Sequence, residues 1–218
     1  MSLEATHLRF SLAIKDDLNV LDLEKYISGA VYPDTRYLTG IERNATHNLN
    51  YFIGRKNLSD FERGWLSHIV GDKVFYEVIE DKFGDFILFE DYQDRWAVLS
   101  AIKIIQDIKD FSSFDIRDLL RYLDYYEIHF HEDERKVVEY NHIIKSLYEN
   151  KEKLIVENCL GMWKKLGNSD EKNARIRKKI IELYEEEDLV EKIDRNFEDG
   201  MGLYEERYKK LMEKYAKN

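Results

Sequence analysis

Three of the six histidines fall early in the sequence, at His7, His47 and His68. His68 lies four residues before Asp72 in a segment with helical periodicity, so both side chains project from one helix face and could hold one metal ion. A hydrogen bond on the helix surface is the competing interpretation, because a sequence with 20 aspartates contains such pairs by chance. Trp65 and other apolar neighbours favour ligation, since polar side chains on a buried helix face need partners.

Asp34 follows Pro33, the only proline of the chain, and a carboxylate in a Pro-Asp turn has little backbone freedom. An Asx turn that only ends a helix is the alternative for this residue. His47 follows Thr46 in the same polar stretch, where a simple surface histidine is the alternative. Imidazole and carboxylate groups suit zinc, iron or manganese, and no thiolate accompanies them. Metal-assisted hydrolysis is the chemistry that these residue types indicate.

In chain order, these residues resemble the motifs of the zinc-dependent phospholipase C and single-strand nuclease superfamily. The pattern has a histidine on an early helix, then G-x-x-x-P-D, T-H and G-x-x-x-H-x-x-x-D. The matching positions are His7; Gly29, Pro33 and Asp34; Thr46 and His47; and Gly64, His68 and Asp72. The match covers about residues 5–78, and the remaining helices carry no motif of the family.

The resemblance implies one zinc ion with four ligands and a second metal that shares one of them. The first site would consist of Asp34, His47, His68 and Asp72, and the second of His7 with Asp72. Iron or manganese is the alternative to zinc for such ligands. The chain departs from the family at its start. The secreted phospholipases also use their processed N-terminal residue as a ligand, but here six residues precede His7, so we expect this ligand to be missing. The spacing of their later His, His and Glu ligands is not found after Asp72 either, which leaves a trinuclear site without support.

The predicted function is metal-dependent hydrolysis of a phosphate ester, a substrate class that the resemblance implies. Asp34 would act as general base as well as ligand. Arg36 and Arg43 flank the same polar stretch, and guanidinium groups beside a metal suit phosphate, although solvated arginines are the alternative. A phosphohydrolase of the His-Asp domain type would need an adjacent His-Asp dipeptide, which this sequence lacks. The alternative function is a non-catalytic helical interaction or scaffold protein with a structural or vestigial metal site.

The other three histidines are expected to lie outside the site. His129 and His131 are two residues apart, a spacing that suits ligands on an extended segment but separates them on a helix, so a helix boundary is the favoured interpretation. His142 lies beside Tyr140 and two isoleucines, where an ordinary core or surface histidine is expected.

Helical periodicity predicts an all-α fold of roughly eight helices. Their ranges are 6–17, 21–32, 60–82, 92–110, 114–127, 132–149 and 151–166, with two or three charged helices in 170–217. Ser59 opens an S-x-x-E capping box for the third helix. Residues 33–58 are irregular, and a long loop of this kind between the second and third helices is usually functional. We expect one domain over 1–218, with the metal-binding part in 1–82 and a helical remainder in 83–218.

Composition supports this picture and limits the partners. With 44% hydrophobic residues, one proline and ten glycines, the chain can build a core and favours helices over turn-rich β structure. A formal charge of −10 opposes binding to duplex nucleic acid. A lone cysteine, Cys159, cannot form an internal disulfide. The first residues lack a signal-peptide pattern and no apolar run is long enough to span a membrane, so we expect neither a signal peptide nor a membrane span. We therefore expect a soluble cytoplasmic protein that acts on a small-molecule or phosphate-ester substrate.

Overall fold

The computed structural model describes residues 4–52, 54–87, 92–149 and 151–216, and every regular element in these ranges is helical. The all-α prediction is therefore confirmed for the described residues. The α-helices are α1 (Glu4–Ile14), α2 (Leu23–Val31), α3 (Arg36–Thr39), α4 (Arg43–Thr46), α5 (Asp60–Ile87), α6 (Tyr92–Ser113), α7 (Glu134–Tyr148), α8 (Val156–Lys165), α9 (Asp170–Glu185), α10 (Glu187–Asp194) and α11 (Asn196–Ala216). The 3₁₀ helices in the same ranges are η1 (Tyr32–Thr35), η2 (Leu49–Phe52) and η3 (Arg117–Asp124).

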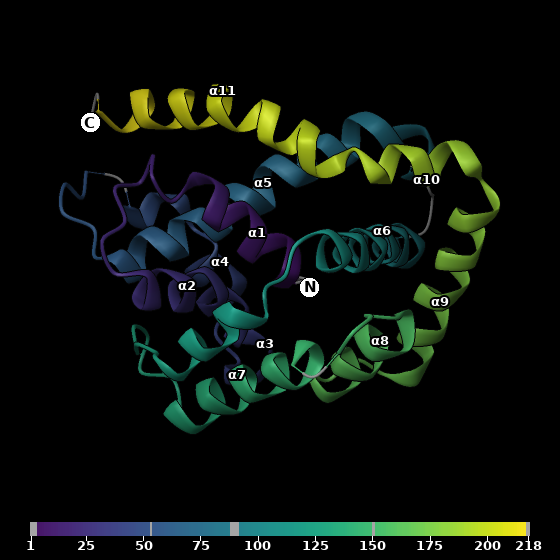
Figure 1. Ribbon diagram of the computed structural model, residues 1–218, viewed down its shortest axis with the longest axis horizontal. Coiled ribbons are helices and arrows are strands. Elements are labelled where there is room, and N and C mark those ends of the chain that lie inside the picture. Colours follow the sequence, from purple (N-terminus) through teal and green to yellow (C-terminus); the bar gives the residue numbers. More distant parts are fainter. Residues whose placement is uncertain (1–3, 53, 88–91, 150, 217–218) are drawn as a thin grey trace.

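The helices form two neighbouring groups that share one core. Helices α1, α2 and α5 pack together at one end of the molecule, and α6 lies in the middle (Figure 1). The chain after α6 passes around it, through α7 and α8 along one side, α9 at the far end, and α10 and α11 along the other side (Figure 1). Helix α11 returns to pack on α5 and α1. A single cluster of buried hydrophobic side chains therefore includes residues from α1 to α11.

Helices α2 and α5 approach each other at two glycines. A Cβ atom on Gly29 would lie 2.0 Å from the carbonyl oxygen of Phe61, and a Cβ atom on Gly64 would lie 1.9 Å from the carbonyl oxygen of Tyr26. No side chain fits at either position, because the obstructing atoms belong to the backbone of the facing helix. Both glycines belong to the motifs singled out in the sequence. Their contact sets how closely the two motif-bearing helices lie.

The start of α5 is fixed by its own cap and by a link to α2. The predicted capping box is present, because the backbone N–H of Glu62 donates to Ser59 Oγ at 3.2 Å and that of Ser59 donates to Glu62 Oε2 at 2.9 Å. The carboxylate of Asp60 accepts from the backbone N–H of Asp22 at 2.7 Å, and Asp22 in turn caps α2. The N-terminal ends of α2 and α5 are thereby joined.

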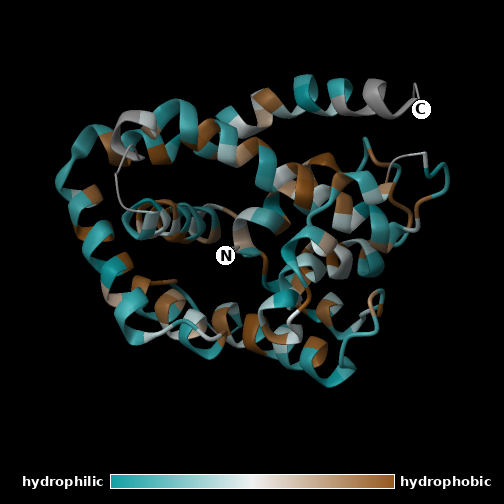
Figure 2. Ribbon diagram, turned by 180° about the vertical axis from the view of Figure 1, so that it is seen from behind, coloured by the Kyte–Doolittle hydropathy of each residue, from teal (hydrophilic) through white to brown (hydrophobic). Residues whose placement is uncertain are grey.

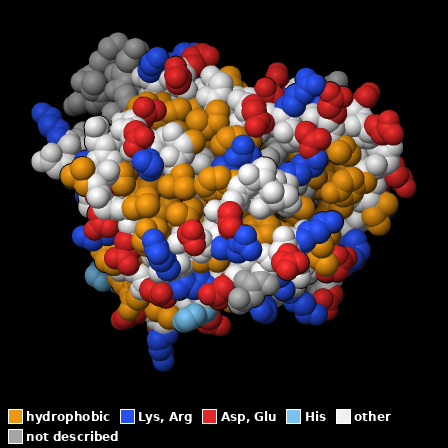
Figure 3. Space-filling view, in the orientation of Figure 1, with side chains coloured by type: hydrophobic (Ala, Val, Ile, Leu, Met, Phe, Trp, Pro, Cys, Tyr) orange, Lys and Arg blue, Asp and Glu red, His pale blue; other side chains and the backbone are white. Residues whose placement is uncertain are grey.

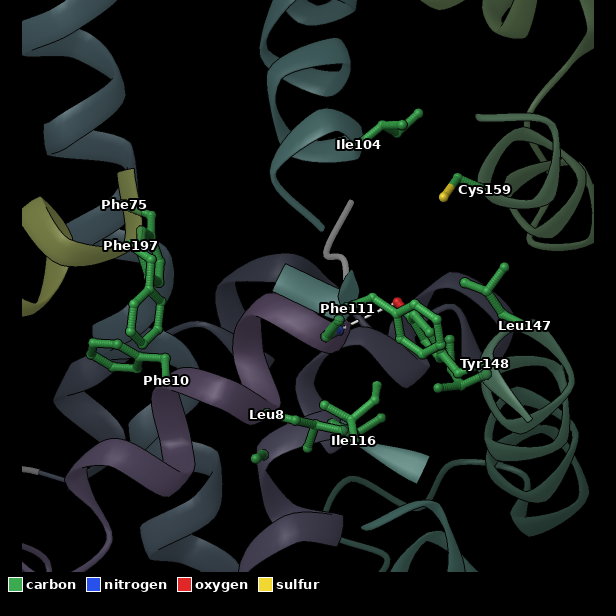
Figure 4. Close-up of a cluster of buried hydrophobic side chains, with 14 of the residues drawn as sticks. Leu8, Phe10, Phe75, Ile104, Phe111, Ile116, Leu147, Tyr148, Cys159 and Phe197 are labelled. Atoms are coloured by element: carbon green, nitrogen blue, oxygen red, sulfur yellow. Dashed lines mark hydrogen bonds between the residues drawn. The ribbon is translucent and has the colours of Figure 1, made fainter. Parts of the chain in front are cut away.

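The first turn of α1 is held by buried side chains from α6 and α7. Asp107 accepts the backbone N–H of Thr6 at 3.1 Å and the hydroxyl of Tyr148 at 2.8 Å. The hydroxyl of Thr6 donates to Asp110 Oδ2 at 2.7 Å. We call Thr6, Asp107, Asp110 and Tyr148 the anchor cluster; Figure 4 shows Tyr148 reaching across the hydrophobic core toward α1. The cluster satisfies backbone N–H groups that the start of a helix leaves without partners. It also fixes the position of the turn of α1 that carries His7.

The prediction of a long loop over residues 33–58 needs correction. Four short helices, η1, α3, α4 and η2, occupy most of this stretch, each four residues long. A helix of one turn cannot display a 3.6-residue hydrophobic period, so the sequence pattern reads as irregular. The stretch that connects α2 to α5 is therefore a series of turns that contacts α2, α5 and α7, rather than an open loop.

The predicted number of helices is also too low, and several boundaries shift. The described residues contain eleven α-helices where roughly eight are predicted. The range 114–127 contains the 3₁₀ helix η3, and the helix predicted from residue 151 begins as α8 at Val156. The single-turn helices α3 and α4 account for most of the difference, whereas α9, α10 and α11 agree with the two or three helices predicted in 170–217. A helix of one turn leaves no periodic pattern in the sequence.

The surface of the bundle is mixed in character. Hydrophobic and hydrophilic residues alternate along the helices in Figure 2, as expected for amphipathic helices around a shared core. On the face shown in Figure 3, Lys and Arg side chains are interspersed with Asp and Glu around several hydrophobic areas. None of the helices in the described part of the chain has the length and apolar composition needed to cross a membrane.

Candidate metal centre

The five residues singled out as ligands come from four separate elements and lie together. His7 is on α1, Asp34 is in η1, His47 directly follows α4, and His68 and Asp72 are one turn apart on α5. His47 Nε2 lies 3.7 Å from Asp34 Oδ1 and 3.6 Å from Asp72 Oδ2. His68 Nε2 lies 3.9 Å from Asp34 Oδ2, and His7 Nε2 lies 3.4 Å from Asp72 Oδ1. The rings of His7 and His68 stack with their centroids 4.0 Å apart.

These separations suit a shared ion better than hydrogen bonds. Three of the four nitrogen-to-oxygen distances lie between 3.6 and 3.9 Å, beyond hydrogen-bond length. Two ligand atoms at 2.0 to 2.2 Å from a tetrahedral zinc ion are roughly 3.3 to 3.6 Å apart. Two groups of three residues have ligand atoms that all lie within 4.8 Å of one another. One group is His7, His68 and Asp72, and the other is Asp34, His47 and His68.

Two of the histidines are oriented by a hydrogen bond at Nδ1, which leaves Nε2 directed at the centre. The Nδ1 atom of His68 lies 2.8 Å from the backbone carbonyl of Ala30, an acceptor, so Nδ1 carries the proton and the lone pair is on Nε2. The Nδ1 atom of His47 lies 2.8 Å from the hydroxyl of Thr46, which leaves its Nε2 directed at the two carboxylates. Backbone or hydroxyl partners of this kind hold the ring orientation of metal-binding histidines.

Several polar atoms at the centre are buried without a protein partner. Within the described part of the chain, His68 Nε2, Asp34 Oδ2 and His7 Nδ1 have no hydrogen-bond partner, and their residues are exposed by only 0%, 2% and 4%. An unsatisfied buried polar group costs about 1–3 kcal/mol, and more when it is charged. A divalent cation would satisfy the lone pairs of the first two atoms directly. The donor set therefore fits such an ion.

The carboxylates are ionised at neutral pH despite their burial. Burial raises the pKa of Asp34, but the facing rings of His68 and His47 bring that pKa down to about 2. Burial also raises the pKa of Asp72, and Lys103 leads the opposing groups that hold this pKa well below its ordinary value. Both side chains are consequently anionic acceptors across the physiological range.

The two histidines that face Asp34 are neutral at the same pH. Burial is the main cause that holds the pKa of His68 well below its ordinary value, and the stacked His7 ring adds to it. Burial lowers the pKa of His47 to about 4, although Asp34 opposes this shift. A divalent cation requires deprotonated ligands, namely neutral imidazole and ionised carboxylate. The fold holds these four side chains in that protonation state.

A cleft of about 510 Å³ opens beside the centre. Its lining residues are Arg43, His47, Leu49, Ile69, Asp72, Lys73, Tyr76, Trp96, Leu99, Ser100 and Lys103. Two of the five candidate ligands thus reach an open surface, while three cationic side chains surround them. A second cleft of about 340 Å³ shares His47, Leu49 and Lys73 with the first and extends toward α11. An anionic ligand is the type that this cationic lining favours.

The two arginines predicted to bind substrate differ in position. Arg43 lies 3.0 Å from Asp72 Oδ2, has 55% of its side chain exposed and lines the cleft. Arg36 Nε lies 3.9 Å from Asp34 Oδ1 in a mostly buried position, and its guanidinium stacks over the Tyr37 ring. Arg36 is not among the described residues that line the cleft. The geometry therefore brings Arg43, rather than Arg36, to the open side of the centre.

Sequence reasoning missed the contribution of α6. Lys103 Nζ lies 3.6 Å from Asp72 Oδ1, and Trp96 forms part of the same cleft wall. Trp96, Leu99 and Lys103 are spaced three and four residues apart on a predicted helix, so they share one face. This spacing is the one feature of the sequence that could have pointed to α6. It shows that the three side chains share a helix face, but not what that face contacts or what it does.

The remaining histidines lie elsewhere. His129 stacks on Phe61 with centroids 5.3 Å apart and bonds Glu127 at 3.1 Å. His131 and His142 are exposed. None of the three belongs to the two groups of candidate ligands found among the described residues.

No family model matches the chain, and searches of curated proteins and of solved structures find no match. The resemblance to the zinc-dependent phospholipase C superfamily stays a prediction that the motif residues carry.

Proposed function

We propose that the chain is a metal-dependent hydrolase of phosphate esters, with zinc as the preferred ion and iron or manganese as alternatives. The observation that carries the proposal is the convergence of His7, Asp34, His47, His68 and Asp72 beside a cleft with a cationic lining. The buried atoms without partners support it, because ligation would remove their desolvation cost.

Asp34, His47 and His68 would hold the ion, and Asp72, with His7 next to it, would lie at the open side of the ion. A bound divalent ion polarises a phosphoryl oxygen and lowers the pKa of bound water from 15.7 to about 7. The exposed guanidinium of Arg43 would donate to phosphoryl oxygens, which accept such bidentate contacts well. Trp96 and Leu99, which also line the cleft, would receive an apolar or aromatic ester group.

Asp34 is better suited to hold the ion than to act as the general base. Its pKa of about 2 lies far below neutral pH, and efficient proton acceptors have a pKa near the working pH. Its complete burial and its two facing histidines fit a ligand role. We propose that Asp34 serves first as a ligand and orients the neighbouring imidazoles, with proton acceptance as a secondary contribution.

The open cleft favours an enzyme over a scaffold with a structural ion. Structural zinc sites are closed by four protein ligands, whereas catalytic sites keep one position for water or substrate. His47 and Asp72 line the cleft wall, so one side of the centre faces solvent. A purely structural ion has no use for an opening of this kind or for the cations around it.

The test is to strip the purified chain with a chelator, reload it with Zn²⁺, Mn²⁺ or Fe²⁺, and assay a panel of phosphate monoesters and diesters. We expect turnover of at least one ester, its loss in His68→Ala, and its retention in His142→Ala, an exposed matched histidine. Stoichiometric metal uptake without turnover, combined with an Asp34→Asn variant that changes only thermal stability, would favour the structural-metal alternative.

A further inference from the structure

We infer that the centre holds a single metal ion and that the ammonium group of Lys103 replaces a second cation beside Asp72. The same ammonium group would donate a hydrogen bond to a phosphoryl oxygen of the substrate. The inference rests on the proposed function and specifies the number of ions and the residue that replaces one. It depends on a count of donor atoms, on the position of Lys103, and on the cleft that Lys103 and Asp72 both line.

The count of donor atoms limits the centre to one fully ligated ion. Both groups of candidate ligands use His68, yet only Nε2 of this ring is available, because Nδ1 is bonded to the carbonyl of Ala30. One nitrogen lone pair binds one ion. When His68 joins Asp34 and His47, the other group retains only His7 and Asp72. Two protein ligands fall short of the three that catalytic zinc sites use.

Lys103 lies where it can compensate for this shortage. Its Nζ atom is 3.6 Å from Asp72 Oδ1, the same oxygen that faces His7 Nε2 at 3.4 Å. The other oxygen of Asp72 faces Arg43 at 3.0 Å. A fixed positive charge therefore faces each oxygen of this carboxylate. A second divalent cation on the same side would be repelled by the ammonium, whereas an anionic oxygen would be attracted.

The same ammonium reaches the space where substrate would bind. Lys103 retains 27% of its side-chain exposure, and it lines the 510 Å³ cleft together with Arg43 and Lys73. In two-metal hydrolases the second ion neutralises charge on the oxygens of an in-line displacement. A lysine at this position supplies one positive charge for that purpose, on a helix that is not part of the ligand set. Lys103 would thus be a phosphate-contacting residue.

Elemental analysis of the full chain reloaded with excess Zn²⁺ and then dialysed tests the number of ions. We expect one equivalent in the wild type and in Lys103→Met, which keeps the shape but removes the charge. Lys103→His removes the fixed charge and adds a third donor, so we expect it to bind a second equivalent. Two equivalents in both the wild type and Lys103→Met would overturn the inference. A wild type that binds no metal would instead overturn the proposed function.

Binding of inorganic phosphate to the zinc-loaded protein, measured by titration calorimetry, tests the second part. We expect Lys103→Met to weaken phosphate binding at least about tenfold and Lys103→Arg to stay within about threefold of the wild type, because it keeps the charge. Equal phosphate affinity in the wild type and Lys103→Met, with one zinc bound in each, would overturn the role of Lys103 and leave the proposed function standing. Circular dichroism checks that each variant is folded.

Discussion

Helix α1 contributes to two buried polar clusters that differ in how far their polar atoms are hydrogen-bonded. In the anchor cluster, both oxygens of Asp107 accept hydrogen bonds, at 3.1 and 2.8 Å, from Thr6 and Tyr148. In the candidate metal centre, Asp34 Oδ2 has no hydrogen-bond partner and faces His68 at 3.9 Å. The first cluster is complete with protein atoms alone. In the second, ligand-type atoms face one another without hydrogen bonds between them among the described residues.

The two carboxylates also differ in their acidity. Burial raises the pKa of Asp107 to about 7, because hydrogen bonds from Tyr148 and Thr6 offset only part of the desolvation. Burial acts on Asp34 in the same direction, yet the histidines facing it bring its pKa to about 2. Burial therefore does not by itself mark a functional carboxylate. The neighbouring groups decide whether a buried carboxyl group keeps its proton, as Asp107 does, or is ionised, as Asp34 is.

The largest effect is expected from Asp34→Asn, which preserves shape and removes the charge. Ester hydrolysis should fall by at least about 100-fold, and metal affinity should fall with it. In the metal-free protein the same change should not lower stability, since a buried charge with an unpartnered oxygen is lost. Steady-state assays, metal titration and chemical denaturation would measure the three quantities. Asp118→Asn at an exposed position is the matched control, and equal activity in both variants would contradict the assignment.

Metal should stabilise the wild type strongly and should have little effect once a ligand is removed. At a free Zn²⁺ concentration of 100 times Kd, binding to the native state adds about 2.7 kcal/mol, which raises the Tm of a chain this size by roughly 5–10 °C. His68→Ala should lose most of that increase, whereas His142→Ala should keep it. Differential scanning calorimetry with and without Zn²⁺ makes the comparison. An equal shift in His68→Ala would place the stabilising ion elsewhere.

Gly64→Ala should separate the helices that carry the ligands. Its added Cβ would lie 1.9 Å from the carbonyl oxygen of Tyr26, so α2 and α5 must move apart, at a cost of about 1–3 kcal/mol. Because Asp34 follows α2 and His68 is on α5, metal affinity should fall as well. Urea denaturation and metal titration measure the two effects. Gly161→Ala is the control, since a Cβ there meets nothing within 4 Å, and equal effects of the two changes would contradict the close-approach argument.

The most gradual effect is a pH dependence that arises from the anchor cluster, because it is spread over about three pH units. Asp107 keeps its proton up to about pH 7 in the native state, but it loses the proton near pH 4 when the chain unfolds. The native state therefore binds more protons in that window, and its contribution to stability falls as pH rises from about 4 to 7, by at most about 1.4 kcal/mol per pH unit. Asp107→Asn should remove this slope.

Urea denaturation of the metal-free protein at pH 5.0, 6.0 and 7.0 would measure the slope in both proteins. An unchanged slope in Asp107→Asn would assign the pH dependence to other groups. Tyr148→Phe provides a further control, because it removes one hydrogen bond to Asp107 and retains the carboxyl group.

Features that depend on neighbours in sequence could be predicted with some success. The capping box of Ser59 and Glu62 depends on residues three apart, and both of its hydrogen bonds are present. The spacing of His68 and Asp72 places them on one face of α5 for the same reason. The all-α class follows from the 3.6-residue period and the scarcity of proline. The single-turn helices within 33–58 fall below the length at which that period becomes visible.

The sequence by itself determined the all-α class, the longer helices, the order of the motifs and the types of candidate ligand, because each of these depends on chemistry within a few residues. Only the tertiary structure decided that four elements meet at one centre, through the glycine contact of α2 with α5 and the anchor cluster under α1. It also decided that Lys103 from α6 faces Asp72 and that Asp34 and Asp107 have opposite pKa shifts. The physical reason is that desolvation and charge interactions depend on distances in space, and packing between helices sets those distances.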